Sequence, residues 1–290
     1  MVDLPRRAVL AALALLPVAG CASPLGTFDA VVPKDGGGRR AARGVAYAAG
    51  PRRTLDVYVP ERTGGPFPVV VFAYGGSWSS GAKEEYDFVG RAFASEGFVT
   101  VVFDYRLVPE VVFPGFVEDA AAAVAWTRRE IGAYGGDPDR IVLAGHSAGA
   151  YIVAMLGLDR SFLAAAGVPR RAVRGVIGLA GPYDFLPLDV SASQRAFGDA
   201  PDLAATQPVN QVTRAAPPFL LATGTDDTTV RPRNSEALAD RLKSAGVPAT
   251  YTRYPGLGHV DILIALSRYG RDDAPVLADA AAFARRVTGG

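Results

Sequence analysis

Apolar runs typical of buried strands alternate with helical patterns along most of the chain. The runs lie at residues 68–72, 99–103, 140–143, 173–179, 219–222 and 249–254. Helical spacing of apolar residues occurs between most of them, at residues 86–95, 116–131, 148–158 and 234–245. This alternation predicts an α/β fold with a mainly parallel central sheet and helices on both faces.

One stretch, residues 185–217, has no clear periodicity. We interpret it as a short cap or pocket wall inserted into the α/β domain. Tyr183, Asp184 and Phe185 open this stretch, and either an acyl pocket or ordinary loop packing accounts for them.

The segment Gly145-His146-Ser147-Ala148-Gly149 joins a predicted strand to a predicted helix. A Gly-x-Ser-x-Gly turn in this position strains the serine backbone and exposes its hydroxyl, so Ser147 is the candidate nucleophile. The pentapeptide alone is weak evidence in a chain with 33 glycines. The flanking strand and helix give it weight.

A serine nucleophile needs a base, and the chain has two histidines. His259 follows the run at 249–254 in a glycine-rich loop, where catalytic groups of α/β sheets lie. His146 adjoins Ser147 but is expected to point away from its hydroxyl. A lone histidine is often structural, yet its position along the chain favours His259 as the base.

A carboxylate between the serine and the histidine is needed to orient the imidazole. Asp226 and Asp227 directly follow the predicted strand at 219–222. Taken alone, either aspartate is more typical of a turn or helix cap than of catalysis. Together with Ser147 and His259 they give the order Ser, Asp, His of α/β-hydrolases.

Backbone amides must also stabilise the oxyanion of a tetrahedral intermediate. Gly76 and Ser77 follow a buried strand in a Gly-Gly loop, and Ala148 follows the nucleophile. We therefore expect these three amides to form an oxyanion hole. An ordinary glycine turn is the alternative for the loop.

With these motifs, the chain from about residue 45 resembles α/β-hydrolases of the esterase-like branch, related to the hormone-sensitive-lipase and kynurenine-formamidase groups. Further similar segments are Leu55-Asp-Val-Tyr-Val-Pro60, Asp104-Tyr-Arg-Leu107, Gly135-Gly-Asp-Pro138 and Gly224-Thr-Asp-Asp227. The resemblance implies Ser147 as nucleophile, His259 as base and Asp227, the later carboxylate, as its partner. Where the family has a loop histidine, this chain has Tyr74.

The N-terminus has the layout of an export signal. Arg6 and Arg7 precede an apolar run at 8–18, and small residues lead to Cys21, the single cysteine. We expect a signal peptide at 1–20, lipidation of Cys21, a flexible tether at 21–43 and a catalytic domain at 44–290, hence an exported, membrane-anchored bacterial lipoprotein. A plain signal peptide is the alternative, and the arginine pair matches a twin-arginine signal loosely.

Charge and composition argue against several classes of function. A formal net charge of +1 offers no field for nucleic acid, and the two histidines and one cysteine leave little for a metal site. We expect no cofactor and a small-molecule ester substrate cleaved through an acyl-enzyme. Amide or peptide hydrolysis by the same residues, or a non-catalytic binding module, are the alternatives.

Overall fold

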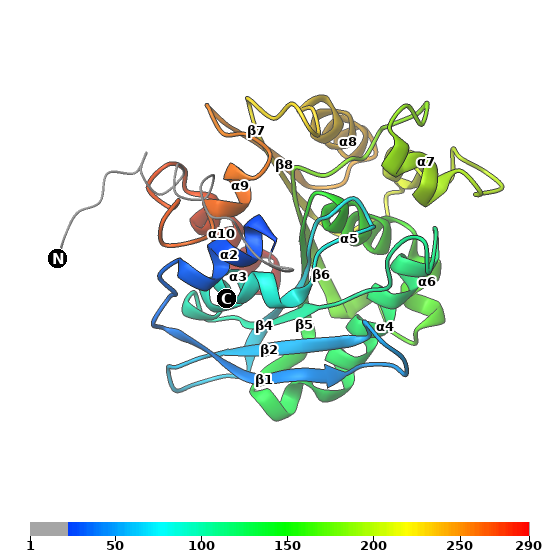
Figure 1. Ribbon diagram of the computed structural model, residues 1–290. Coiled ribbons are helices and arrows are strands. Elements are labelled where there is room, and N and C mark those ends of the chain that lie inside the picture. Colours follow the sequence, from blue (N-terminus) through cyan, green and yellow to red (C-terminus); the bar gives the residue numbers. More distant parts are fainter. Residues whose placement is uncertain (1–22, 290) are drawn as a thin grey trace.

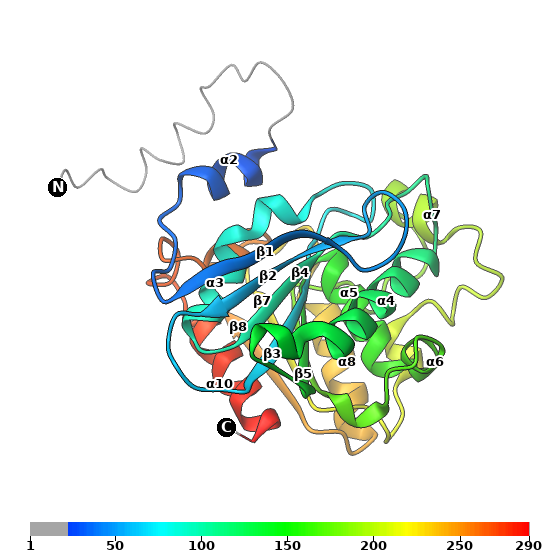
Figure 2. The same ribbon diagram turned by 90° about the horizontal axis from the view of Figure 1, so that it is seen from below.

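One eight-stranded sheet forms the centre of the computed structural model, which describes residues 23–289 (Figure 1). Its strands are β1 (Gly38–Ala46), β2 (Thr54–Pro60), β3 (Phe67–Ala73), β4 (Val99–Phe103), β5 (Gly136–His146), β6 (Val173–Leu179), β7 (Phe219–Gly224) and β8 (Ala249–Tyr254). Their order in the sheet is β1-β2-β4-β3-β5-β6-β7-β8. In this order, all neighbouring strands from β4 to β8 pair in parallel. Strand β2 pairs antiparallel with both β1 and β4. Strands β1 and β2 form the edge of the sheet that faces the viewer in Figure 2.

Helices cover both faces of this sheet. On one face lie α3 (Asp87–Ser95) and α10 (Val276–Thr288), and on the other lie α4 (Gly115–Glu130), α5 (Ala148–Leu158) and α8 (Arg233–Ser244) (Figures 1 and 2). The shorter helices are α2 (Pro24–Val31), α6 (Arg160–Ala165), α7 (Ser191–Phe197) and α9 (Asp261–Ile264). None of the helices within residues 23–289 combines the length and the apolar character that a bilayer crossing requires.

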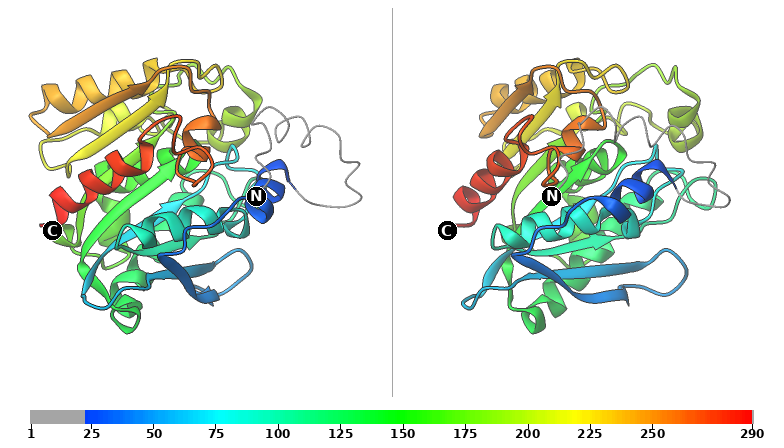
Figure 3. Two further views of the ribbon diagram at one scale, coloured as in Figure 1. Left: turned by 90° about the vertical axis from the view of Figure 1, so that its left-hand side faces the viewer. Right: turned by 60° about the vertical axis from the view of Figure 1, so that its left-hand side comes forward.

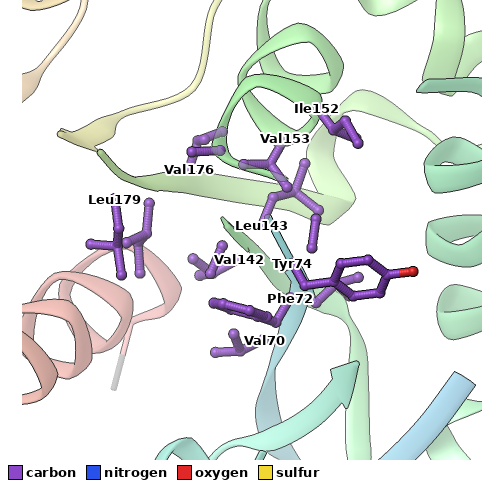
Figure 4. Packing of buried hydrophobic residues seen from close by; sticks show 14 of the residues in the cluster. Val70, Phe72, Tyr74, Val142, Leu143, Ile152, Val153, Val176 and Leu179 are labelled. Atoms are coloured by element: carbon purple, nitrogen blue, oxygen red, sulfur yellow. The ribbon is translucent and has the colours of Figure 1, made fainter. Parts of the chain in front are cut away.

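The core lies where α5 crosses the central strands. Every residue of α5 is buried, which explains why its sequence is apolar around the whole helix. Val153 of α5 lies over Leu143 and Val176 of the sheet (Figure 4). Since parallel strands covered on both faces are buried on both sides, β3 to β7 have apolar runs rather than alternation.

The predicted fold class is confirmed, and each of the six predicted strands is present. The main boundary difference is at the predicted strand 140–143, since β5 extends over Gly136–His146. Strands β1 and β2 and helix α10 were not predicted. The stretch 185–217 contains α7 and a 3₁₀ turn, Pro208–Gln211, and otherwise consists of loop.

The N-terminal region differs from the prediction of a flexible tether at 21–43. Within it, α2 and the start of β1 are ordered parts of the domain. Ser23 caps α2 by accepting the amide hydrogen of Gly26. Cys21 and the signal peptide predicted at 1–20 lie outside the described residues.

Side-chain contacts explain why α2 is fixed. The ring of Phe28 lies 5.4 Å from that of Phe88 and 6.3 Å from that of Tyr269, measured between centroids. The Asp29 carboxylate accepts the amide hydrogen of Phe88 at 2.8 Å. Figure 3 shows α2 lying against the body of the domain. The catalytic domain therefore begins before residue 44.

We expect Phe28→Ala to lower the free energy of unfolding by about 3 kcal/mol, because it leaves a cavity between Phe88 and Tyr269. Val31→Ala is the matched control on the same helix, since Val31 is 67% exposed. It should change the free energy by less than about 0.5 kcal/mol. Urea unfolding of both variants measures the difference, and equal effects would contradict the packing role of α2.

Candidate active site

Ser147 occupies a sharp turn between β5 and α5. Its backbone has φ of 54° and ψ of −123°, a strained conformation for a residue other than glycine. Gly149 must be small because a Cβ atom there would lie 2.0 Å from the carbonyl oxygen of Ala73. The Gly-x-Ser-x-Gly pattern thus reflects close contact between the start of α5 and the end of β3.

The structure brings Ser147, His259 and Asp227 together from three separate loops. The Oγ of Ser147 lies 2.9 Å from Nε2 of His259, and the Nδ1 of His259 lies 2.8 Å from Oδ2 of Asp227. Ser147 and Asp227 are buried, while the His259 side chain is partly exposed. In the tautomer with hydrogen on Nδ1, His259 donates to Asp227 and accepts the hydroxyl hydrogen of Ser147.

The two adjacent aspartates have different environments. The Oδ1 of Asp227 accepts the amide hydrogens of Thr229 and Val230 at 2.9 and 2.8 Å, which fixes the carboxylate toward His259. Asp226 is exposed and accepts the hydroxyl hydrogen of Thr225. Asp227, and not Asp226, therefore meets the imidazole.

His146 contacts the backbone of the loop that contains His259. Its Nε2 donates to the backbone carbonyl of His259 at 2.8 Å, so it points to that backbone rather than to the serine hydroxyl. Burial, and secondarily the nearby His259, lowers the pKa of His146 to about 3. His146 is therefore neutral at physiological pH and remains a donor. No sequence pattern predicts this bond, because its acceptor is a main-chain oxygen.

The Gly-Gly loop lies beside the serine. A Cβ atom on Gly75 would be 3.0 Å from the Cβ of Ser147. Gly76 and Ser77 have φ of 122° and 52°, so the loop turns sharply after β3. Within residues 23–289, the amides of Gly76, Ser77 and Ala148 take part in none of the turn, loop or side-chain hydrogen bonds. These amides are thus available to an oxyanion at Ser147.

Tyr74 directly precedes the Gly-Gly loop and is hydrogen-bonded on the side away from Ser147 to Asp104 and Arg52. Its hydroxyl donates to Asp104 Oδ1 at 2.9 Å and accepts from Arg52 Nη2 at 2.8 Å. Arg52 also donates to the carbonyl of Gly81, at the far end of the loop. Burial raises the pKa of Tyr74 well above its ordinary value, so the hydroxyl keeps its hydrogen. Arg52 was not predicted from the sequence, and it lies in no recognisable motif.

Two pockets meet at Ser147. The α2 pocket, of about 500 Å³, includes His259 and the side chains of Leu25, Phe28, Tyr86, Val260, Leu263 and Ile264. The α7 pocket, of about 400 Å³, includes Trp78, Ala148, Phe185, Val190, Arg231 and Asn234.

Part of these walls was predicted. Phe185 lines the α7 pocket, in agreement with the interpretation of this stretch as a pocket wall. Tyr183 is fully buried instead, in agreement with ordinary packing. Leu25 and Phe28 were missed as wall residues. Ser23 followed by Pro24 was the available signal, because serine at an N-cap with proline in the first helical turn marks a helix start. Nowhere in residues 23–289 do three His, Cys, Asp or Glu side chains form a metal-binding group.

We expect His146→Gln to reduce the dependence of stability on pH. His146 has an ordinary pKa of 6.5 but a pKa of about 3 when folded, so only the unfolded chain binds a proton between these values. Its stabilising contribution is therefore complete above pH 6.5 and is lost as the pH falls toward 3. Glutamine keeps an N–H donor for the His259 carbonyl without the titration.

The measurement is the free energy of unfolding in urea at about pH 7.5 and about pH 5. Between these conditions the wild type should lose more stability than the variant. Parallel losses in the two proteins would show that His146 does not titrate in this way.

The chain resembles curated esterases in sequence. It is 30% identical over 246 residues to a probable isoprenylcysteine alpha-carbonyl methylesterase of Arabidopsis thaliana, covering 77% of this chain and 51% of that protein. It is 31% identical over 245 residues to Esterase LipC of Mycobacterium tuberculosis, covering 75% of this chain and 59% of that protein. The chain thus spans little more than half the length of these relatives.

Solved structures show the same fold. Esterase B from Lactobacillus rhamnosis, inhibited by a tributyrin phosphonate, has a TM-score of 0.80 at 21% identity, with 98% of this chain and 94% of that chain covered. The BD-FAE family matches residues 55–242, which include Ser147 and Asp227 but not His259. Because this match covers more than half of the chain, the protein belongs to the BD-FAE family, and its fold is that of the esterase- and lipase-like α/β-hydrolases.

Proposed function

We propose that this protein is a serine hydrolase of carboxylic esters. The observation that carries the proposal is the continuous hydrogen-bonded chain from Ser147 through His259 to Asp227. It lies at the junction of two pockets, beside a loop with available amides. The esterase names of the sequence relatives support ester rather than amide substrates.

In the first half of the reaction, Ser147 Oγ attacks the ester carbonyl carbon while His259 Nε2 takes the hydroxyl proton. The carbonyl oxygen becomes an oxyanion that accepts hydrogen bonds from the amides of Gly76, Ser77 and Ala148. Removing one such donor typically costs about 3–4 kcal/mol of transition-state stabilisation. The bond between the carbonyl carbon and the alkoxy oxygen then breaks, and His259 gives its proton to the leaving alcohol.

In the second half, water replaces the alcohol. His259 takes a proton from this water, whose oxygen attacks the acyl carbon. The bond to Ser147 Oγ breaks, the serine recovers its proton from His259, and the carboxylic acid leaves. Throughout, Asp227 keeps the imidazole in one tautomer and stabilises its positive form.

For location, we propose an exported lipoprotein anchored in a membrane through Cys21. The support is the order of a basic start, an apolar run and small residues ahead of a single cysteine. Stable anchoring needs more than one acyl chain, and a bacterial lipoprotein has several.

The adjacent aspartates provide a matched pair for testing the catalytic assignment. Asp227→Asn should lower kcat by up to about 10⁴-fold, because the amide favours the wrong tautomer of His259. Asp226→Asn, one residue away and exposed, should leave kcat/KM nearly unchanged. Turnover of a chromogenic acetate ester measures both variants, and Ser147→Ala gives the background, about 10⁶-fold below wild type in kcat.

Circular dichroism checks that all three variants fold, and a fluorophosphonate probe should label the wild type at Ser147 alone. A severe loss in Asp226→Asn beside a normal Asp227→Asn would reverse the assignment. Retained activity in Ser147→Ala would refute the nucleophile.

Lipidation of Cys21 predicts where the protein fractionates. Cys21→Ser should move the protein from the membrane fraction to the soluble fraction of a bacterial host, because no acyl chains are attached. Mass spectrometry of the mature N-terminus shows whether the export segment was removed. Unchanged membrane association after removal of that segment would contradict the anchor.

A further inference from the structure

The two pockets share Ser77 and Ser147 but differ in the other reacting groups that line them. His259 and the adjacent Val260 line the α2 pocket and are absent from the walls of the α7 pocket. Of the proposed oxyanion donors, Ala148 lines the α7 pocket alone and Gly76 lines the α2 pocket alone. A substrate bound at Ser147 therefore has one arm beside the base and the other arm beside the first turn of α5.

The proton-transfer step indicates which part of the ester lies in which pocket. His259 must protonate the leaving alkoxy oxygen, so this oxygen has to come within about 3.2 Å of Nε2. The alkoxy side of the ester must then extend along the wall that His259 belongs to. Resting on the proposed esterase function, we infer that the alcohol part of the substrate occupies the α2 pocket and that the acyl part occupies the α7 pocket.

The walls of the α2 pocket indicate the chemistry of this alcohol. Leu25 and Phe28 belong to α2, Leu263 and Ile264 to α9, and Tyr86 to the 3₁₀ turn Lys83–Tyr86 that precedes α3. Two of its polar wall residues are paired with each other, since Ser23 Oγ donates to Glu85 Oε1 at 2.5 Å. A pocket of about 500 Å³ with these walls suits an uncharged, apolar alcohol of several carbons.

The α7 pocket has a different character. Its apolar part is formed by Trp78, Phe185 and Val190, but Arg231 and Asn234 also belong to its wall. An acyl group placed there meets both aromatic rings and polar side chains. The alcohol part is thus selected by residues of α2 and α9. The acyl part is selected by residues of the stretch around α7.

The test separates the two arms with two series of esters. The alcohol series consists of ethyl, butyl and hexyl acetate, and the acyl series consists of ethyl acetate, butanoate and hexanoate. Wild-type kcat/KM should increase along the alcohol series. Leu25→Trp, which fills the α2 pocket, should lower the ratio of kcat/KM for hexyl acetate to that for ethyl acetate by about tenfold or more. The corresponding ratio for ethyl hexanoate should not change.

Matched variants keep the result interpretable. Ile264→Trp fills the same pocket from α9 and should repeat the effect even if Leu25→Trp does not fold. Val31→Trp, on the exposed side of α2, should change neither ratio. Val190→Trp, in the α7 pocket, should lower only the ratio for the acyl series.

The opposite pattern would overturn the inference. If Leu25→Trp and Ile264→Trp lower the acyl ratio and spare the alcohol ratio, the acyl group occupies the α2 pocket. If both ratios stay unchanged in both variants, neither arm uses it. Labelling of Ser147 by a fluorophosphonate together with turnover of ethyl acetate tests the esterase function itself, so its failure is distinguishable from failure of the pocket assignment.

Discussion

The geometry of the site depends on the contact between the first turn of α5 and the end of β3. Gly149 allows α5 to lie directly against the carbonyl of Ala73, where any Cβ atom would overlap. This contact sets Ser147 beside Gly75, so the serine and the loop that follows β3 share one rigid frame. A side chain at position 149 would push α5 away from β3 and move Ser147 away from Gly75.

The base is attached to this frame at two points. Asp227, after β7, binds the His259 ring, and His146, at the end of β5, binds the His259 backbone. The loops after β7 and β8 are also joined to each other, since the amide of Asp226 donates to the carbonyl of Leu257 at 3.0 Å. Burial lowers the pKa of His146, so this ring stays neutral at physiological pH and donates to the His259 carbonyl.

The sequence predicted the features that depend on local patterns. Apolar runs gave the central strands, and the glycines around Ser147 indicated the turn at the end of β5. The order of Ser147, Asp227 and His259 gave the groups that the structure brings together. Each of these patterns is short, and the fold places it at the end of a strand.

The missed features depend on contacts between distant segments. Leu25 and Ile264 share a pocket although more than two hundred residues separate them, and neither lies in a recognisable motif. The tether was misread for a related reason. The many glycines and prolines of residues 22–43 favoured a flexible linker. Instead, the Phe28 ring packs on Phe88 and Tyr269, and the Phe88 amide donates to Asp29, which together fix α2.

The pairing of β3 with β5 has a consequence for how this protein can diversify. Ala73 pairs with Gly145 in the parallel register, and both Gly75 and Ser147 lie two residues beyond that pair. An insertion within either strand would shift one group against the other. Much of the pocket walls comes instead from α2 and α9 and from the loop around α7, which lie outside this register. Sequence changes there can alter substrate selection over evolutionary time while the reacting atoms keep their positions.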